Sequence, residues 1–120
     1  MESKTESSQN IISWEAFLKV EIRVGTIIDC KEFKEAKKPA YQVWVDFGQD
    51  LGIKKSSAQI THLYACQDLI GKQVMAVLNF TPKQIGPFRS EILILGLHNA
   101  QGAVSLVSPD HLVPNGTKLL

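Results

Sequence analysis

Short stretches in which hydrophobic and polar side chains alternate recur along this chain of 120 residues, and they constrain its fold more than any other feature. Residues 20–24 and 41–47 show this period of two clearly, which is typical of half-buried β-strands. Because Gly25 interrupts the first stretch, as at a bulge or a sharp bend, we expect the strands to curl into a small barrel. The first strand is expected to continue over residues 26–28, and further strands are expected over residues 53–60, 73–80, 91–97 and 103–107.

Among small barrels, the five-stranded OB-fold fits this all-β pattern well, since it commonly has a helical connection between its third and fourth strands. Residues 66–70, which Gly71 closes, predict a short helix or turn at that place. An SH3-like barrel is the main structural competitor, but such barrels are usually shorter. The sequence therefore predicts an OB-fold barrel.

A short helix is expected before the first strand, over residues 14–19. Ser13 is a suitable N-cap for this helix, and Trp14, Phe17 and Leu18 fall on one helical face. That face is large for so short a helix, which therefore either plugs one end of the core or packs on a second copy of the chain.

The expected domain organisation is a mobile tail over residues 1–12, followed by one domain over 13–120 that ends in a C-terminal extension. The extension is apolar and punctuated by prolines. Together with the N-terminal helix, it carries more apolar side chains than one small barrel needs. This surplus predicts a self-complementary homodimer interface or, alternatively, a cap over an open barrel end within one chain.

The charge of the chain is unevenly distributed, although its formal net value is only +1. Residues 1–50 contain seven Lys and Arg against nine Asp and Glu, whereas residues 51–120 contain six against three. A local basic patch can matter while the total stays near zero. The N-terminus lacks the apolar core of a signal peptide, and the longest apolar run, 92–95, is too short to span a bilayer. We therefore expect a cytoplasmic protein without membrane insertion.

No constellation of residues indicates bond-breaking chemistry, so the chain is not expected to be an enzyme. The three histidines lack the spacing of metal ligands, and Ser56 and Ser57 lie outside any nucleophile-elbow motif. Neither a metal nor a cofactor is expected. Cys30 and Cys66 form no CxxC pair; their separation permits a disulfide, but two thiols in a reduced compartment are the expected state.

Two polar and cationic segments, residues 52–61 and 79–91, lie between the apolar strands. Lys and Arg side chains contact phosphates, while Ser and Asn add directed hydrogen bonds, so these segments predict a surface that reads a nucleic-acid backbone. Phe80 and Phe88 could offer π-faces to a single-stranded base. Core packing is the expected role of Phe80, whereas both roles stay open for Phe88.

The order of these segments resembles the CsaA family of small tRNA-binding-domain proteins, from Phe17 to the end of the chain. The matching pieces cover nearly everything except the first dozen residues: 17–27, 38–41, 46–48, 52–61, 69–74, 79–80, 84–91, 108–110 and 113–116. The chain is more distantly similar to the tRNA-binding domain appended to methionyl-tRNA synthetases and to the endothelial-monocyte-activating polypeptide.

This resemblance implies an OB-fold homodimer that binds tRNA largely by its shape and backbone. The family's tRNA surface, transferred to this sequence, comprises Lys54, Lys55, Ser57, Asn79, Ser90 and Glu91. We add Lys83 and Arg89 because of their charge and position. The resemblance also implies an alternative role, that of an export-related molecular chaperone that binds unfolded precursor proteins. Trp44 and Phe88 are the candidate peptide-binding residues for that role.

Overall fold

The computed structural model of the chain describes residues 10–120. Most of the predicted tail, residues 1–9, lies outside the described residues. The described part contains two short helices, α2 (Trp14–Leu18) and α3 (Cys66–Leu69), and nine strands. The strands are β1 (Ile22–Glu32), β2 (Tyr41–Asp46), β3 (Ile53–Ala58), β4 (Gln73–Val77), β5 (Lys83–Ile85), β6 (Phe88–Ser90), β7 (Leu93–Ile94), β8 (Gly96–His98) and β9 (Val104–Leu106).

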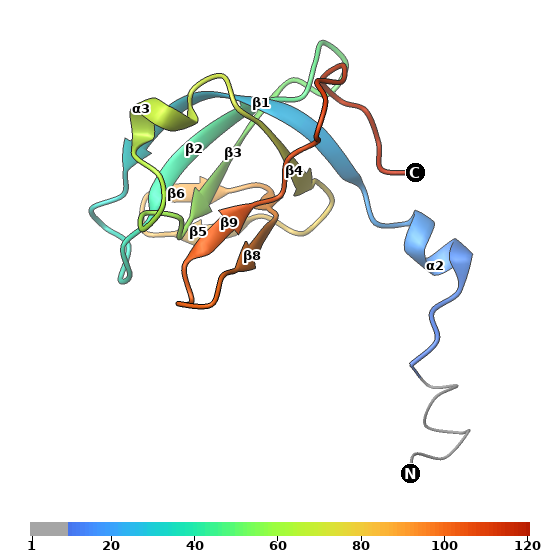
Figure 1. Cartoon of the computed structure of the whole chain (residues 1–120), viewed down its shortest axis with the longest axis horizontal. Coiled ribbons are helices and arrows are strands. Elements are labelled where there is room, and N and C mark those ends of the chain that lie inside the picture. The colour runs from blue at the N-terminus through green and yellow to red at the C-terminus, as the bar shows by residue number, and fades with distance from the viewer. Residues whose placement is uncertain (1–9) are drawn as a thin grey trace.

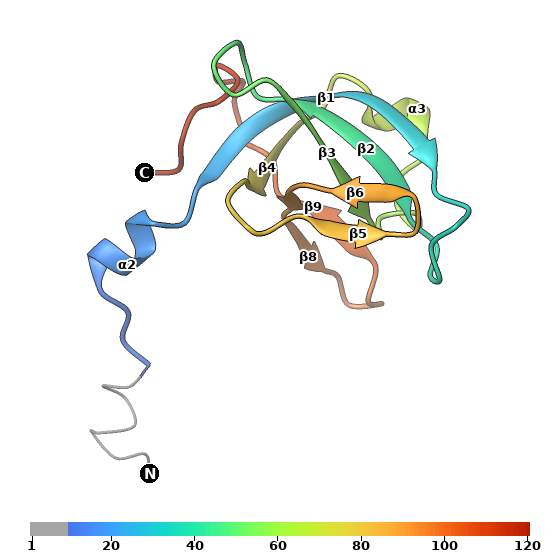
Figure 2. The same cartoon turned by 180° about the vertical axis from the view of Figure 1, so that it is seen from behind.

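Five of these strands form one antiparallel sheet in the order β3-β2-β1-β4-β7. The sheet curls around a central core, and the hairpins β5–β6 and β8–β9 lie beside its open side (Figures 1 and 2). Contacts of β3 with β6 and β7 nearly close the barrel. Helix α3 lies between β3 and β4, where the sequence predicted it, and the OB-type barrel is confirmed.

The core forms because the alternating strands turn one row of side chains inward. Val43, Val45 and Phe47 are buried on β2 and directly after it, as the period of two predicts. Gly25 lies against this row: a Cβ atom there would be only 2.6 Å from Val45 Cγ1 and 2.7 Å from Phe47 Cδ1. Gly25 thus marks a close approach of β1 to the core that any side chain would obstruct. The bulge expected at Gly25 lies further along β1 instead, where the register with β2 shifts between Ile27 and Asp29.

A second, smaller apolar cluster lies outside the main core. Phe33, Ala40 and Phe88 are its buried members, and Trp44 and Ile85 pack against it. The ring of Phe88 is 5.3 Å from that of Phe33 and 5.9 Å from that of Trp44, measured between ring centroids. This cluster fastens the β5–β6 hairpin to the outer side of β2.

The two chain ends differ from the barrel, because much of their apolar surface is exposed. Ser13 caps α2 as predicted, accepting a hydrogen bond from the Ala16 amide at 3.0 Å, yet α2 buries none of its residues. In Figure 1 this helix stands away from the barrel. The C-terminal segment returns along β1, where the Gly116 amide donates to the Val24 carbonyl at 2.7 Å. No helix among the described residues has the length and apolarity to cross a bilayer.

Four local expectations were wrong. The segment 91–97 is two short strands, β7 and β8, instead of one. The β5–β6 hairpin was not expected, because strands of three residues show no measurable periodicity. Phe80 is 57% exposed instead of packed in the core. Finally, Cys30 and Cys66 form a disulfide between β1 and α3, not two free thiols, because the fold brings their Cα atoms to 5.3 Å.

Candidate nucleic-acid interface

A row of hydrogen bonds joins the β3 strand to residues 90–92, at the end of β6 and directly after it. We call β3 together with residues 90–92 the seam. The Lys55 amide donates to Glu91 Oε1 at 3.0 Å, and the Glu91 amide donates to the Lys55 carbonyl at 2.8 Å. The Ser57 amide donates to Ser90 Oγ at 3.0 Å. Glu91 and Ser90, two predicted tRNA-binding residues, therefore have side chains that already serve the closure of the barrel.

Asn79 is likewise engaged within the chain. Its Oδ1 accepts from the Glu21 amide at 3.0 Å, and its Nδ2 donates to the Lys19 carbonyl at 2.6 Å. The side chain thus ties the end of β4 to the link between α2 and β1. Asn79, which the family resemblance groups with the tRNA-binding residues, therefore has both ends of its amide hydrogen-bonded within the chain.

The cations of β3 occupy different surroundings. Lys54 and Lys55 are both partly buried, opposite Val45 and Trp44 on β2. The ammonium of Lys55 lies 5.3 Å from the centroid of the Phe88 ring, a distance at which a cation–π attraction operates. Lys55 therefore supports the hairpin, while its charge still reaches the surface.

Lys83 and Arg89 are exposed on the β5–β6 hairpin, where Lys83 pairs with Ser90 and Gln84 pairs with Arg89. The hairpin turns at Gly86 and Pro87, and Gly86 has a φ of +56°. Glycine at the first central position, with positive φ, is typical of the II′ turns that join two-residue hairpins. The turn thus holds the two cations on a defined ribbon and not on a loose loop.

A groove runs between the end of β3 and the β5 strand. It consists of two adjoining hollows that share Ser57, Gln59, Lys83 and Ile85. One hollow extends to Phe80 and Leu93, whereas the other extends to Lys37, Lys38 and Gly86. We call these residues together the groove. It brings together four of the predicted site residues, Ser57, Lys83, Ser90 and Glu91. It adds four residues that the sequence interpretation missed or assigned elsewhere: Lys37, Lys38, Gln59 and Phe80.

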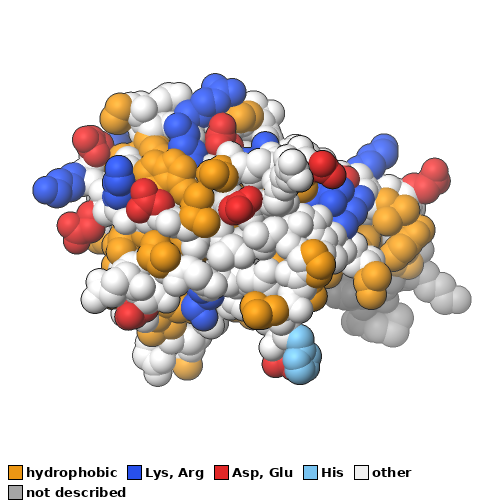
Figure 3. All heavy atoms as spheres, turned by 90° about the horizontal axis from the view of Figure 1, so that it is seen from above, with side chains coloured by type: hydrophobic (Ala, Val, Ile, Leu, Met, Phe, Trp, Pro, Cys, Tyr) orange, Lys and Arg blue, Asp and Glu red, His pale blue; other side chains and the backbone are white. Residues whose placement is uncertain are grey.

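The face of the molecule that Figure 3 presents has no continuous basic patch. Figure 3 shows basic, acidic and hydrophobic side chains interspersed on the face that it presents. A ligand with negative charge would therefore meet separate cations at several points, which suits an extended polyanion better than a single small anion.

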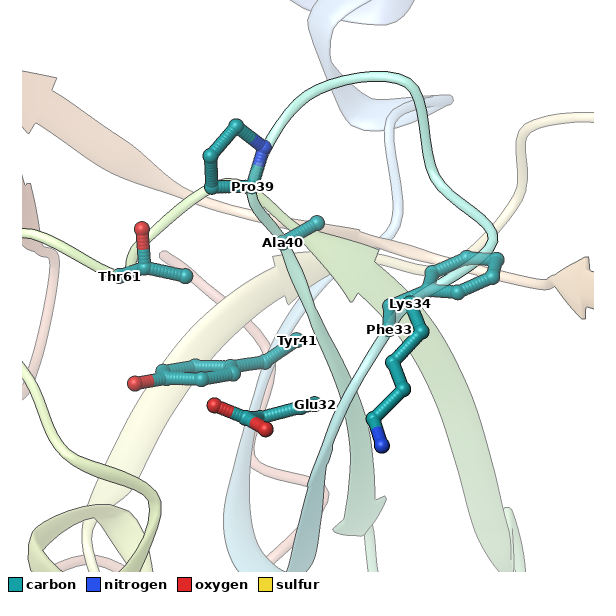
Figure 4. A pocket seen from close by; sticks show the side chains of 7 residues that line it. All are labelled: Glu32, Phe33, Lys34, Pro39, Ala40, Tyr41 and Thr61. Carbon is teal, nitrogen blue, oxygen red and sulfur yellow. The ribbon is translucent and has the colours of Figure 1, made fainter.

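Another hollow, at the base of the 33–40 loop, offers less chemistry. Its lining includes Glu32, Lys34 and Tyr41, and Figure 4 shows the Glu32 carboxylate and the Tyr41 ring lying next to each other. The Tyr41 hydroxyl donates to the Tyr64 carbonyl at 2.8 Å. With that hydroxyl engaged, the hollow presents no converging set of polar groups, and we assign it no ligand.

The two residues predicted to bind peptides, Trp44 and Phe88, are partners in the second apolar cluster. Phe88 is only 6% exposed, because the rings of Phe33 and Trp44 and the Lys55 side chain cover it. A peptide site built on the Phe88 ring would therefore need a surface that this structure covers, and the core-packing role is the one observed.

Glu21 forms ion pairs with two cations that lie outside the groove. Lys118 Nζ lies 3.0 Å from Glu21 Oε2, and Arg23 Nη2 lies 2.9 Å from Glu21 Oε1. The hydrogen bond from Lys118, followed by that from Arg23, holds the pKa of the Glu21 carboxyl below its ordinary value. Lys118 and Arg23 thus have an acidic partner within the chain.

Residues 10–120 contain no group of three or more His, Cys, Asp or Glu side chains placed to hold a metal ion.

Residues 22–118 match the family model described as "Putative tRNA binding domain", and the chain belongs to this family. Among curated proteins it is similar to the methionine–tRNA ligase of Flavobacterium johnsoniae, with 32% identity over 113 residues. Those residues are 94% of this chain but only 16% of the ligase, so the chain spans a small part of that relative's length.

Solved structures narrow the comparison further. The chain is 47% identical to the chaperone CsaA of Bacillus anthracis str. Ames, with a TM-score of 0.85 and coverage of 92% of this chain and 99% of that one. The CsaA chaperone protein of Picrophilus torridus gives the same identity and TM-score, with coverage of 92% and 100%. The resemblance to the CsaA family is thereby confirmed along nearly the whole described chain.

Proposed function

We propose that this chain is a tRNA-binding protein of the cytoplasm, which recognises tRNA by its shape and backbone through the groove and the cations around it. The observation that carries the proposal is the state of those cations. The ion pairs found within residues 10–120 join Glu21 to Arg23 and Lys118, and Asp110 to His111. None of them involves the cations of the groove and its hairpin, which are Lys37, Lys38, Lys83 and Arg89.

These four side chains are exposed, and they extend from the 33–40 loop and from the β5–β6 hairpin. Their positive charges can pair with phosphates without first breaking an internal ion pair. Ser57 and Gln59 between them supply polar side chains that both donate and accept hydrogen bonds. Such contacts position a nucleic-acid backbone and carry no sequence information directly, which favours recognition by shape.

The test is a titration of two tRNAs of different sequence, at several salt concentrations, followed by fluorescence anisotropy. Each phosphate contact contributes roughly −0.7 to −0.9 to the log–log salt slope, so four engaged cations give a slope of roughly −3 per protomer. We expect similar affinities for the two tRNAs and this steep dependence on salt. Absence of binding at low salt, or a flat salt response, would contradict the proposal.

The proposal includes a homodimer, in which α2 and the C-terminal segment form the self-complementary face. Lys118 Nζ donates to the Leu18 carbonyl at 3.2 Å, so the two ends lie side by side. Their apolar side chains are open to solvent in the single chain: Ile11 is 74% exposed, Ile12 64%, Trp14 65% and Leu120 99%. A two-fold interface would bury them on both copies and double the number of phosphate contacts.

Sedimentation velocity tests the dimer directly. A Trp14→Glu variant places a charge in the centre of the expected interface, and we expect it to sediment as a monomer with an intact barrel, because α2 buries none of its residues. Ile53→Glu is the matched control, since Ile53 is also exposed, at 58%, but lies on β3. A wild-type monomer, or an unchanged dimer in Trp14→Glu, would contradict this part of the proposal.

The alternative function, a chaperone for unfolded precursor proteins, is favoured by the names of the two CsaA structures. Because Phe88 is covered, the exposed apolar side chains around α2 offer a surface for such a role that the Phe88 ring does not. That surface is also the proposed dimer interface. Binding of an unfolded polypeptide that weakens as the protein dimerises, with little response to salt, would support the alternative.

A further inference from the structure

The Phe80 side chain is the most unusual feature of the groove, because it is a large aromatic residue that is 57% exposed three residues after the core strand β4. The last two residues of β4, Ala76 and Val77, are buried. An exposed ring at such a place forgoes the stabilisation that burial would provide. Its position therefore calls for a ligand that covers it.

The backbone around Phe80 is held on both sides. Asn79 binds the Lys19 carbonyl and the Glu21 amide, which fixes the end of β4 against the start of β1. Pro82 restricts the preceding residue to extended conformations and leads the chain away into β5. Phe80 thus projects from a braced position and offers its ring at little entropic cost.

The hollow beside this ring has the chemistry of a base-binding site. Its apolar lining comes from Phe80, Ile85, Ile92 and Leu93, while Ser57, Gln59 and Thr81 supply donors and acceptors around it. The Glu91 carboxylate, which also borders the hollow, already accepts the Lys55 amide, so one of its oxygens is turned toward the seam. Lys83 lies in the same lining, where it can pair with a phosphate next to the bound base.

We infer that this hollow, which we call the Phe80 hollow, binds one unpaired RNA base stacked on Phe80. The inference rests on the proposed RNA-binding function and adds to it the kind of nucleotide that the groove receives. Base-paired RNA presents its bases edge-on and stacked, so an aromatic platform is useful only where a nucleotide is unpaired. The neighbouring hollow, with Lys37 and Lys38, then receives the adjoining backbone.

An extended apolar peptide is the competing occupant. The charge around the groove favours RNA, since Lys37, Lys38 and Lys83 line it while Glu35 is the acid that borders the same hollow without a partner among residues 10–120. A peptide would also gain about equally from any large apolar side chain at position 80. Stacking of a base, by contrast, requires an aromatic face, and this difference separates the two occupants.

The experiment compares two RNA hairpins by anisotropy, one with a blunt end and one with the same stem followed by two unpaired nucleotides. Stacking contributes roughly 1–3 kcal/mol per base, so we expect the wild type to prefer the overhang by about 5-fold or more. Phe80→Leu keeps apolar volume but lacks a ring, and it should lose this preference for the overhang. Phe80→Trp should retain the preference.

Each outcome decides a different question. A wild type that binds both hairpins equally, or a Phe80→Leu variant that keeps the preference, would overturn the base-binding inference while leaving tRNA binding intact. Absence of binding to tRNA and to both hairpins would overturn the proposed function and this inference together. Binding of an apolar peptide that Phe80→Leu does not weaken, without any overhang preference, would assign the groove to peptides. Circular dichroism and thermal unfolding of both variants establish that the exposed position tolerates the changes.

Discussion

The seam and the groove share the β3 strand, but they use their polar side chains in opposite ways. In the seam, the side chains of Ser90 and Glu91 accept hydrogen bonds from β3 amides and so complete the barrel. In the groove, Lys83 extends into solvent without an ion-pair partner among residues 10–120. One region is polar because the barrel must close, whereas the other is polar because, as we propose, a ligand binds there.

The site residues that the family resemblance implies therefore differ in whether their side chains are already engaged within the chain. A polar side chain that accepts a hydrogen bond within the chain holds its neighbours in place, and part of its hydrogen-bonding capacity is already used. A cation without a partner can bind a phosphate directly. Of the predicted tRNA-binding residues, Asn79, Ser90 and Glu91 belong to the first kind, and Lys83 and Arg89 to the second.

The largest expected effect on stability comes from removing the disulfide, and the loss expected from a change in the seam can be compared with it. Cys30 and Cys66 are 36 residues apart, and removal of a disulfide that closes such a loop lowers the free energy of unfolding by ~2–4 kcal/mol. We expect the Cys30→Ser/Cys66→Ser variant to show this loss in urea unfolding, with tRNA affinity unchanged in the folded protein. Identical unfolding midpoints for the variant and the wild type would show that the disulfide does not contribute.

Glu91→Ala tests whether the seam is structural. Its carboxylate accepts a backbone hydrogen bond in a partly buried place, and hydrogen bonds to charged groups contribute about 1.5–3 kcal/mol. We expect a loss of stability of that size in urea unfolding. The control is Glu35→Ala, which removes an exposed acid from the 33–40 loop and should change stability by less than about 0.5 kcal/mol. If Glu91→Ala were as stable as its control and lost tRNA binding, Glu91 would be a ligand contact.

The smallest effect on stability is expected at Glu21. Its partners Arg23 and Lys118 are cations engaged in ion pairs within the chain, unlike those of the groove. Because Lys118 and Arg23 hold the pKa of Glu21 below its ordinary value of 4.5, the stabilisation is fully present above pH 4.5. It disappears as the pH falls through the lowered pKa. We expect the wild type to be more stable than Glu21→Gln at neutral pH and equally stable in acid well below pH 4.5. An unchanging difference across this range would show that the ion pairs do not stabilise the fold.

Features that depend on neighbours in sequence were predicted correctly. The alternation of β2 gave its buried face, Ser13 gave the helix cap, and Gly71, with a φ of +90°, closes α3 as expected. Each of these depends on the conformation of a few successive residues. The OB-type barrel followed from their order together with the family resemblance.

Features that depend on distant partners were not predictable from the sequence alone. Asn79 finds its partners 58 and 60 residues away, so nothing in its own segment indicates a structural role. Phe80 was expected in the core because of its hydrophobicity, but β4 ends at Val77, so Phe80 lies beyond the alternation that turns side chains inward. The groove itself depends on the β5–β6 hairpin, whose three-residue strands carry no periodic signal.

The salt dependence of tRNA binding by two single-charge variants tests directly whether the groove is the RNA-binding surface. Lys83→Ala removes a groove cation, whereas Lys72→Ala removes an equally exposed cation from the α3–β4 connection. We predict that Lys83→Ala weakens binding and makes the log–log salt slope shallower by roughly 0.7–0.9 per protomer, and that Lys72→Ala changes neither. Equal losses in both variants, or no change in Lys83→Ala, would contradict the assignment of the groove as the RNA-binding surface.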